Sequence, residues 1–135
     1  NNVQQVAALQ QALATIQRQY KTRFMVKVGE HIKSVATEKI AFFLADGRTL
    51  FLFTQKGRKF IVDYKLEELE GLLDPTLFFR ANRSFLVNIH AITDVLVYSN
   101  SRLKIVSEPP APKEIIISRE KVTDFKSWFD GVDIS

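Results

Sequence analysis

The stretch FFRANRSFLVN, residues Phe78 to Asn88, decides how the chain is interpreted. It places Arg80 and Arg83 in an otherwise apolar run, and no carboxylate occurs between Pro75 and Thr93. The apolar residues are typical of a buried strand. A guanidinium in such surroundings requires a carboxylate, a phosphate or a guanine edge as its partner. The stretch therefore predicts a buried strand whose arginines need an anionic partner.

Two kinds of partner are compatible with these arginines. Acids elsewhere in the chain, such as Asp63, Asp74 or Asp94, would pair with them inside the fold, and this alternative is stronger for Arg80 than for Arg83. Otherwise the partner is an external anion, which Arg83 would reach as the end of an anchored loop.

The composition indicates one globular domain. The chain has 135 residues, of which 46% are hydrophobic, with eleven Phe and no Cys. This is enough for a packed core, and it excludes a disulfide scaffold and a thiolate metal site. His31, expected in solvent, and His90, expected on a strand face, are too few for a histidine-rich metal centre. Neither has a catalytic context, so we expect no enzyme activity, no cofactor and no metal.

The sequence shows no apolar run of 18 residues and no signal peptide, so no membrane span is expected. The absence of Cys fits a reducing compartment, and the expected location is the cytoplasm. The chain does not begin with Met, which fits an upstream part that was cut away or processed off. A net charge of +4 is compatible with an anionic partner.

The hydrophobic pattern predicts an N-terminal helix from Val3 to about Thr22. Its apolar residues recur at three- and four-residue spacing: Val6, Leu9, Leu13, Ile16 and Tyr20. This helix either packs on the domain or serves as a linker or dimer helix. We therefore divide the chain into a linker helix, residues 1–22, and a domain, residues 23–135.

From Arg23 onward the pattern is mainly that of strands joined by tight turns. The turns are expected at Gly29, Gly47 and Gly57 and near Asn100, with FLVNIHAITDVLVY as strand and a last strand at EIIIS after a Pro-rich loop.

Two short helices interrupt this pattern. In DYKLEELEGLL, Asp63 is expected as the cap, with three leucines on the apolar face and Glu67, Glu68 and Glu70 on the exposed face. In SREKVTDFKSWFD, Ser118 is expected as the cap. The inward stripe of this last helix is expected at Val122, Phe125 and Phe129.

Basic residues gather in three segments: Arg48 with Lys56, Arg58 and Lys59; Arg80 with Arg83; and Arg119 with Lys121. Cations at the start of a helix are unfavourable for the helix, but the same place favours a bound phosphate. Lys56, Arg58 and Lys59 are also compatible with a solvated hairpin tip.

FFRANRSFLVN resembles the signature of the LytTR DNA-binding domain, which has a pattern like F-F-R-x-H-R-S-[YF]-x-V-N. Asn82 stands where the family usually has His. The segments EKIAFFLADGRTLFLF, YKLEELEGLL and IIISREKVTDFKSWF are similar to the family's flanking elements. The matching signature positions are Phe78, Phe79, Arg80, Arg83, Ser84, Phe85, Val87 and Asn88.

The resemblance extends from Phe24 to Phe129 and implies a small, elongated, mainly β fold with short helices and no helix-turn-helix. It also implies the output domain of a bacterial response regulator, which binds promoter direct repeats by inserting loops into successive major grooves. The implied partners are double-stranded DNA, an upstream receiver or sensor module, and a second copy as a homodimer on DNA.

The resemblance also assigns roles to residues. The base-reading residues are Arg48 or Thr49, Arg83 and Arg119. The residues that contact the DNA backbone or support the loops are Arg80, Asn82, Ser84, Asn88 and Lys121. Asn88 has the alternative of tying the loop to backbone groups through its side chain rather than touching DNA. The first loop, Ala45 to Thr49, lacks the family's usual aromatic or histidine reader.

A function from another class competes with DNA binding. A β-rich interaction module could use the same basic loops to bind an acidic partner protein. Such a module would not distinguish a promoter repeat from scrambled DNA.

Overall fold

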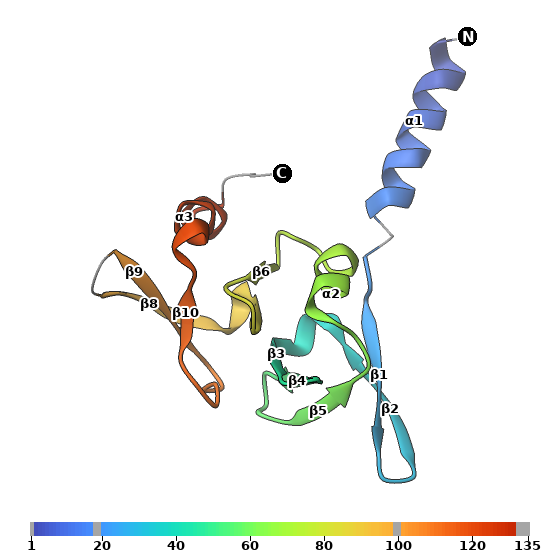
Figure 1. Cartoon of the computed structure of the whole chain (residues 1–135). Helices are drawn as coiled ribbons and strands as arrows, with labels where there is room; N and C mark the ends of the chain where they lie inside the picture. The colour runs from blue at the N-terminus through green and yellow to red at the C-terminus, as the bar shows by residue number, and fades with distance from the viewer. Residues whose placement is uncertain (1, 18–19, 99–100, 132–135) are drawn as a thin grey trace.

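A computed structural model of the chain describes residues 2–17, 20–98 and 101–131, with the backbone alone for residues 2, 11–17 and 98. The body is built around a five-stranded antiparallel sheet with the strand order β5-β4-β3-β7-β6 (Figure 1). Its strands are β3 (Ile40–Asp46), β4 (Thr49–Thr54), β5 (Lys59–Val62), β6 (Phe78–Arg80) and β7 (Phe85–Asn88).

The central strand β3 is buried from Ile40 to Leu44, because both faces of the sheet are covered. This accounts for the unbroken apolar run of the sequence, since a strand that is covered on both sides has no polar face. A bulge between Ile40 and Phe42 shifts the register, and Ala41 and Phe42 belong to the same core.

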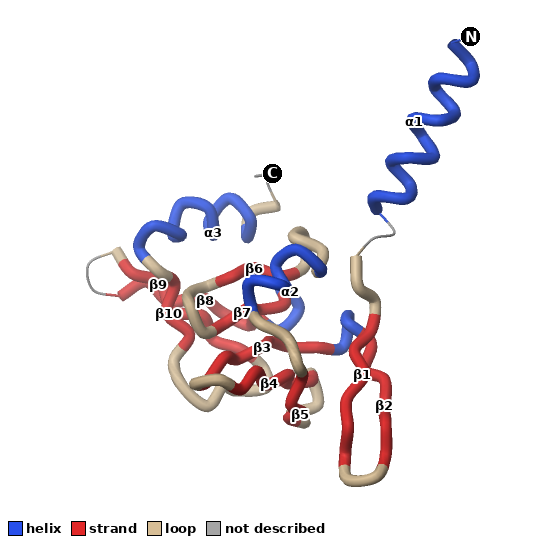
Figure 2. The backbone as a smooth tube through the Cα atoms, turned by 45° about the vertical axis from the view of Figure 1, so that its right-hand side comes forward, coloured by secondary structure: helices blue, strands red, loops and turns tan. Residues whose placement is uncertain are grey.

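A hairpin and a short helix cover one face of the central sheet. The hairpin consists of β1 (Arg23–Val28) and β2 (His31–Ala36), and the helix is α2 (Leu66–Leu72) (Figure 2). The core on this side includes Phe24, Phe43, Leu52, Leu66, Leu69, Leu73 and Leu86.

A second sheet and the last helix cover the other face. The three-stranded sheet has the order β10-β9-β8, with β8 (Ile92–Tyr98), β9 (Arg102–Ser107) and β10 (Ile115–Ile117). Helix α3 (Val122–Phe129) follows a 3-10 turn, Arg119–Lys121. This core includes Phe42, Phe85, Val87, Leu103, Ile105, Ile115, Phe125 and Trp128.

The expected hairpin turns are confirmed at the three glycines. Gly29, Gly47 and Gly57 have φ angles of +60°, +64° and +85°, a region that favours glycine. The turn expected near Asn100 lies outside the described residues. His31 is exposed, as expected. The continuous strand expected through His90 is wrong: a 3-10 turn, Ile89–Ala91, separates β7 from β8 and leaves His90 exposed.

The expected cap at Asp63 is wrong, and Ser118 takes the N-cap position only of the 3-10 turn before α3. Helix α2 has Lys65 at its N-cap position instead of Asp63, and the Lys65 N–H donates to the carboxylate of Glu68 at 3.1 Å. Glu68, the third residue of the helix, therefore satisfies the N–H of the N-cap residue by the bond typical of a capping box. Ser118 makes no side-chain capping bond, and α3 itself begins only at Val122, after the 3-10 turn.

The inward stripe of α3 is also corrected. Phe129 is 44% exposed, whereas Trp128 is 6% exposed and belongs to the core. The Trp128 indole N–H donates to the carbonyl of Pro75 at 2.8 Å, so the larger ring is buried with its polar group satisfied. Phe129 stacks on Phe125 from outside, with the ring centroids 5.4 Å apart.

Helix α1 (Asn2–Gln17) projects from the body (Figure 1). The expected extension to Thr22 is wrong, because residues 20–22 are not helical. Val6 and Leu9 are 53% and 62% exposed, so these two side chains do not pack on the domain; Leu13 and Ile16 lie outside the described side chains. Among the described helices, none is long and apolar enough to cross a membrane.

Candidate nucleic-acid interface

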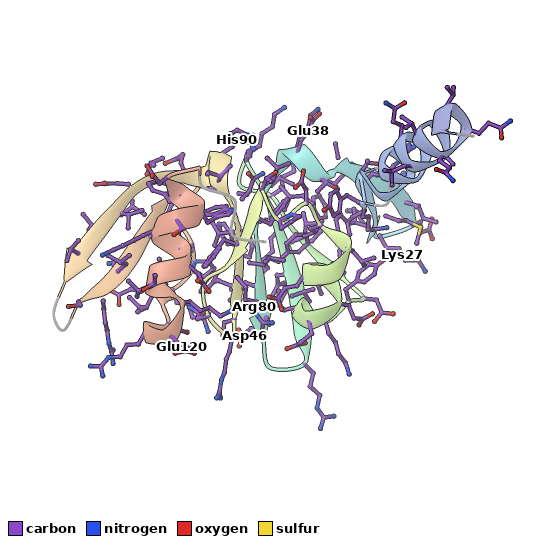
Figure 3. The ribbon with its side chains drawn as sticks, turned by 90° about the horizontal axis from the view of Figure 1, so that it is seen from above. Lys27, Glu38, Asp46, Arg80, His90 and Glu120 are labelled. Carbon is purple, nitrogen blue, oxygen red and sulfur yellow. The ribbon has the colours of Figure 1, made fainter. Side chains whose placement is uncertain are left out.

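Three loops that are far apart in the sequence lie along one edge of the molecule. They are the β3–β4 turn, the loop between β6 and β7, and the segment before α3. Figure 3 shows Asp46, Arg80 and Glu120, one from each region, on the same edge, with Glu38 and His90 on the opposite edge.

Backbone hydrogen bonds fix these loops to one another. The Ala45 N–H donates to the carbonyl of Ser84 at 2.8 Å, which joins the end of β3 to the β6–β7 loop. The Ser118 N–H donates to the carbonyl of Ala81 at 3.0 Å, which joins the third segment to the same loop. The central loop is therefore held from both sides by main-chain contacts.

Arg83 is exposed at the tip of the central loop. Within the described part of the chain, its guanidinium makes no hydrogen bond or ion pair. In particular, it does not pair with Asp63, Asp74 or Asp94. The alternative of an internal acid therefore does not hold for Arg83 among these residues, and its five donors remain available to an external anion.

Arg80 is paired inside the fold. Its Nη1 lies 2.8 Å from a carboxylate oxygen of Glu70, and its Nη2 lies 3.3 Å from one of Glu67. The Arg80 side chain is 13% exposed. The internal-acid alternative is thus right for Arg80, although its partners come from α2 and not from the three aspartates.

Asn82 locks the loop from within. Its Oδ1 accepts from the N–H groups of Ser84 at 2.7 Å and Phe85 at 3.1 Å, and its Nδ2 donates to the carbonyl of Ile116 at 2.7 Å. The residue that stands in place of the family's His therefore ties the loop to β10.

Asn88 supports the fold at the far end of β7. Its side chain is fully buried, its Nδ2 donates to the carbonyl of Ile40 at 2.8 Å, and its Oδ1 accepts from the His90 N–H at 2.9 Å. The expected side-chain bonds of Asn88 to backbone groups are confirmed, but they hold Ile40 and His90 and not the loop between β6 and β7.

The two flanking loops present one exposed arginine each. Arg48 is exposed in the turn between Asp46 and Thr49, which face each other across the β3–β4 pair, and Thr49 is half-buried. Arg119 is exposed at the start of the 3-10 turn. The Lys121 side chain is bonded inside the fold, because its Nζ donates to the carbonyl of Arg80 at 3.2 Å.

The basic segment that groups Arg48 with Lys56, Arg58 and Lys59 in the sequence does not stay together in the fold. Lys56 and Arg58 lie at the β4–β5 turn, at the other end of β4 from Arg48. The neighbouring Gln55 binds the carbonyls of Lys39 and Glu38, both at 2.9 Å, which places this turn at the opposite edge (Figure 3).

Lys113 is a cation of this edge that the sequence interpretation missed. It lines a shallow depression of about 400 Å³ together with Asn82, Arg83, Ser84, Phe85, Glu114, Ile116 and Ser118. Glu114 is paired with Lys104 at 3.0 Å, so the depression has an excess of positive charge. The sequence shows a lysine after a Pro-rich loop but contains no signal that this loop folds back beside Arg83.

The acids of α2 were also missed as part of this region. The sequence does contain a sign of their joint role, because Glu67 and Glu70 are three residues apart and so share a helix face. No group of three or more His, Cys, Asp or Glu residues that could hold a metal ion occurs within residues 2–17, 20–98 and 101–131.

Comparison with known proteins gives a consistent picture. Residues 30–130 match the family model of the LytTr DNA-binding domain. The fold is similar to the solved LytTr DNA-binding domain of a protein described as a methyl-accepting/DNA response regulator from Bacillus cereus. That similarity has a TM-score of 0.71 at 20% identity and covers 80% of this chain and 96% of the other.

Curated relatives are bacterial regulators of greater length. Sensory transduction protein LytT of Oceanobacillus iheyensis is 27% identical over 110 residues, which make up 82% of this chain and 44% of the relative. Transcriptional regulatory protein YpdB of Escherichia coli K12 is 28% identical over 113 residues, with coverages of 84% and 45%. The chain therefore spans less than half the length of these relatives.

The family model covers most of the chain, and the mainly β fold with short helices is the one expected from the signature. The chain belongs to the LytTR family of DNA-binding domains.

Proposed function

We propose that this domain reads promoter DNA by inserting the loops of one edge into successive major grooves. The observation that carries the proposal is Arg83, an exposed arginine without an internal partner among the described residues, on a loop fixed by hydrogen bonds. A rigid loop with a free guanidinium meets the geometric requirement for bidentate contact with guanine.

The flanking loops extend this reading edge. Arg119 and either Arg48 or Thr49 are the proposed base-reading residues on its two sides. Arg80, Asn82, Ser84, Asn88 and Lys121 are proposed as supporting or backbone-contacting residues, and Lys113 adds a cation for phosphate. Phosphate contacts position the domain and make binding salt-dependent, whereas contacts with base edges select the sequence.

The wider assembly is proposed from the relatives. They are named as sensory transduction and transcriptional regulatory proteins and are more than twice as long as their matched regions. An upstream receiver or sensor module would then control the domain, in the cytoplasm. Promoter direct repeats are the proposed target, bound by two copies as a homodimer.

The test is DNA-binding anisotropy with a duplex that the wild-type domain enriches from a random pool, against a scrambled duplex of the same composition. Arg83→Gln is expected to lower the ratio of the two affinities by about 5- to 150-fold, the equivalent of roughly 1–3 kcal/mol for one bidentate contact. Arg58→Gln removes the same charge at the opposite edge and should leave this ratio unchanged.

Three results would contradict the proposal. They are the enrichment of no sequence, binding that does not change with salt, and an Arg83→Gln variant with the ratio of the wild type. Any of them would favour the competing function, in which the basic edge binds an acidic partner protein.

A further inference from the structure

We propose that Arg80, Glu67 and Glu70 form a brace that sets the conformation of the Arg83 loop, so that Arg80 is a positioning residue and not a DNA ligand. The inference rests on the proposed function and assigns a part in DNA reading to helix α2. Figure 3 shows Arg80 on the same edge of the molecule as Asp46 and Glu120.

The Arg80 guanidinium bonds directly to the backbone of the loop. Its Nε donates to the carbonyl of Asn82 at 2.9 Å, and its Nη2 donates to the carbonyl of Arg83 at 3.1 Å. The carbonyl of the proposed reading residue is therefore held by Arg80, and a change in the position of this guanidinium changes the direction in which Arg83 points.

Helix α2 holds the other side of the same guanidinium. Nη1 donates to Glu70 at 2.8 Å, and Nη2 also donates to Glu67 at 3.3 Å. Because the guanidinium is planar, carboxylates on one side and carbonyls on the other fix both its position and its plane. Residues 67 and 70 belong to a helix that is packed on the core through Leu66 and Leu69, so the brace is anchored to the rigid body.

These contacts leave Arg80 poorly suited to bind phosphate. Four of its five N–H groups already donate, and its side chain is 13% exposed. The two carboxylates offset its positive charge, whereas the exposed Arg83 has no carboxylate partner among the described residues. A phosphate could reach only the one remaining Nη1 N–H, and a bidentate contact would displace at least one of these bonds.

The brace and a phosphate contact predict opposite effects for the loss of the acids. If Arg80 bound phosphate, Glu67→Gln/Glu70→Gln would free it and strengthen binding. If Arg80 is a brace, the same double variant loosens the loop and weakens the preference for the enriched duplex. Glu68→Gln is the matched control, since it removes a charge from the same helix while Gln keeps an acceptor for the Lys65 N–H.

The experiment measures the affinities of the enriched and scrambled duplexes at several KCl concentrations. For Glu67→Gln/Glu70→Gln we expect the affinity ratio to fall by about fivefold or more, with an unchanged salt slope. Arg80→Gln should lower the affinity ratio similarly. The triple variant with all three changes should lower it little further, because Arg80 and the two glutamates act as a unit. The glutamates are exposed, so the double variant is expected to fold.

Three outcomes would overturn the brace. In the first, the double variant binds DNA like Glu68→Gln or more tightly. In the second, Arg80→Gln reduces the salt slope by about one, as the loss of a phosphate contact does. In the third, the effects of Arg80→Gln and of the glutamate double variant on the affinity ratio add. Arg83→Gln separates the two proposals: if it abolishes the preference and the double variant does not, reading stands and the brace fails.

Amide hydrogen exchange tests the brace without DNA. The Ser84 N–H is bonded to Asn82 inside the loop, and it should exchange faster in Glu67→Gln/Glu70→Gln than in Glu68→Gln. Equal exchange at Ser84 in the two variants would show that the acids do not order the loop, whatever the DNA measurements give.

Discussion

At the scale of single residues, the arginines of one motif have opposite environments. Arg80 is surrounded by two carboxylates and two carbonyls, whereas Arg83, three positions later, extends into solvent. The sequence predicted that both need an anion, and it favoured an internal acid more for Arg80 than for Arg83. It did not predict which acids, because Glu67 and Glu70 reach Arg80 only after α2 has packed on the sheet.

Asn88 allows a prediction about stability at this scale. Asn88→Ala removes the donor to the Ile40 carbonyl, a group at the buried start of β3, and should lower the free energy of unfolding by about 1–3 kcal/mol. Thr93→Ala removes an exposed hydrogen bond to the Val106 carbonyl and should change it by only about 0.5 kcal/mol. Urea unfolding of the two variants checks this, and equal losses would contradict it.

At the scale of elements, turns were predictable and helix starts were not. A glycine with a positive φ is required locally, so Gly29, Gly47 and Gly57 are visible in the sequence. The start of α3 depends on the 3-10 turn before it, and the burial of Trp128 depends on Pro75, which is far away in the sequence. Contacts between distant parts of the chain therefore decide these features, and the local hydrophobic pattern does not.

The surroundings of Glu67 on α2 predict that stability depends on pH. The pKa of Glu67 is lowered from its ordinary value of 4.5, first by a backbone hydrogen bond and then by the side-chain bond from Arg80, with Lys65 adding a weaker attraction. A lowered pKa in the folded state contributes stability above pH 4.5 that is lost as the pH falls through the folded value.

We therefore expect wild type to be more stable than Glu67→Gln at neutral pH, with a difference that shrinks as the pH falls below about 4.5. Urea unfolding of both proteins at a series of pH values measures this difference. Glu68, Glu70 and Arg80 are present in both proteins, so the comparison isolates the change at residue 67. A difference that grows on acidification would contradict the expected direction.

At the scale of the whole molecule, the family signature gave the architecture, while the limits of the domain depend on long-range bonds. The division at residues 22 and 23 stays a prediction. However, the Lys21 N–H donates to the Leu72 carbonyl at 2.7 Å, and the Thr22 carbonyl accepts from the Thr37 N–H at 2.9 Å. No local pattern could show that these two residues are bonded to the body.

Truncation tests where the domain begins. Removal of residues 1–19 should leave the free energy of unfolding nearly unchanged, because it keeps both of these bonds. Removal of residues 1–22 should lower it by about 1–3 kcal/mol, since the Leu72 and Thr37 groups lose their partners. Thermal or urea unfolding of the two truncated chains measures this difference. Equal stabilities would place the start of the domain at Arg23.

The main-chain bonds from Ala45 and Ser118 to the central loop have a consequence for evolution. They fix the positions of the loops without the side chains of Arg48, Arg83 or Arg119, which have no bonds to lose among the described residues. Exposed positions of this kind tolerate substitution at little cost in stability. If these arginines read bases as proposed, new target sequences require only substitutions at the loop tips and leave the scaffold unchanged.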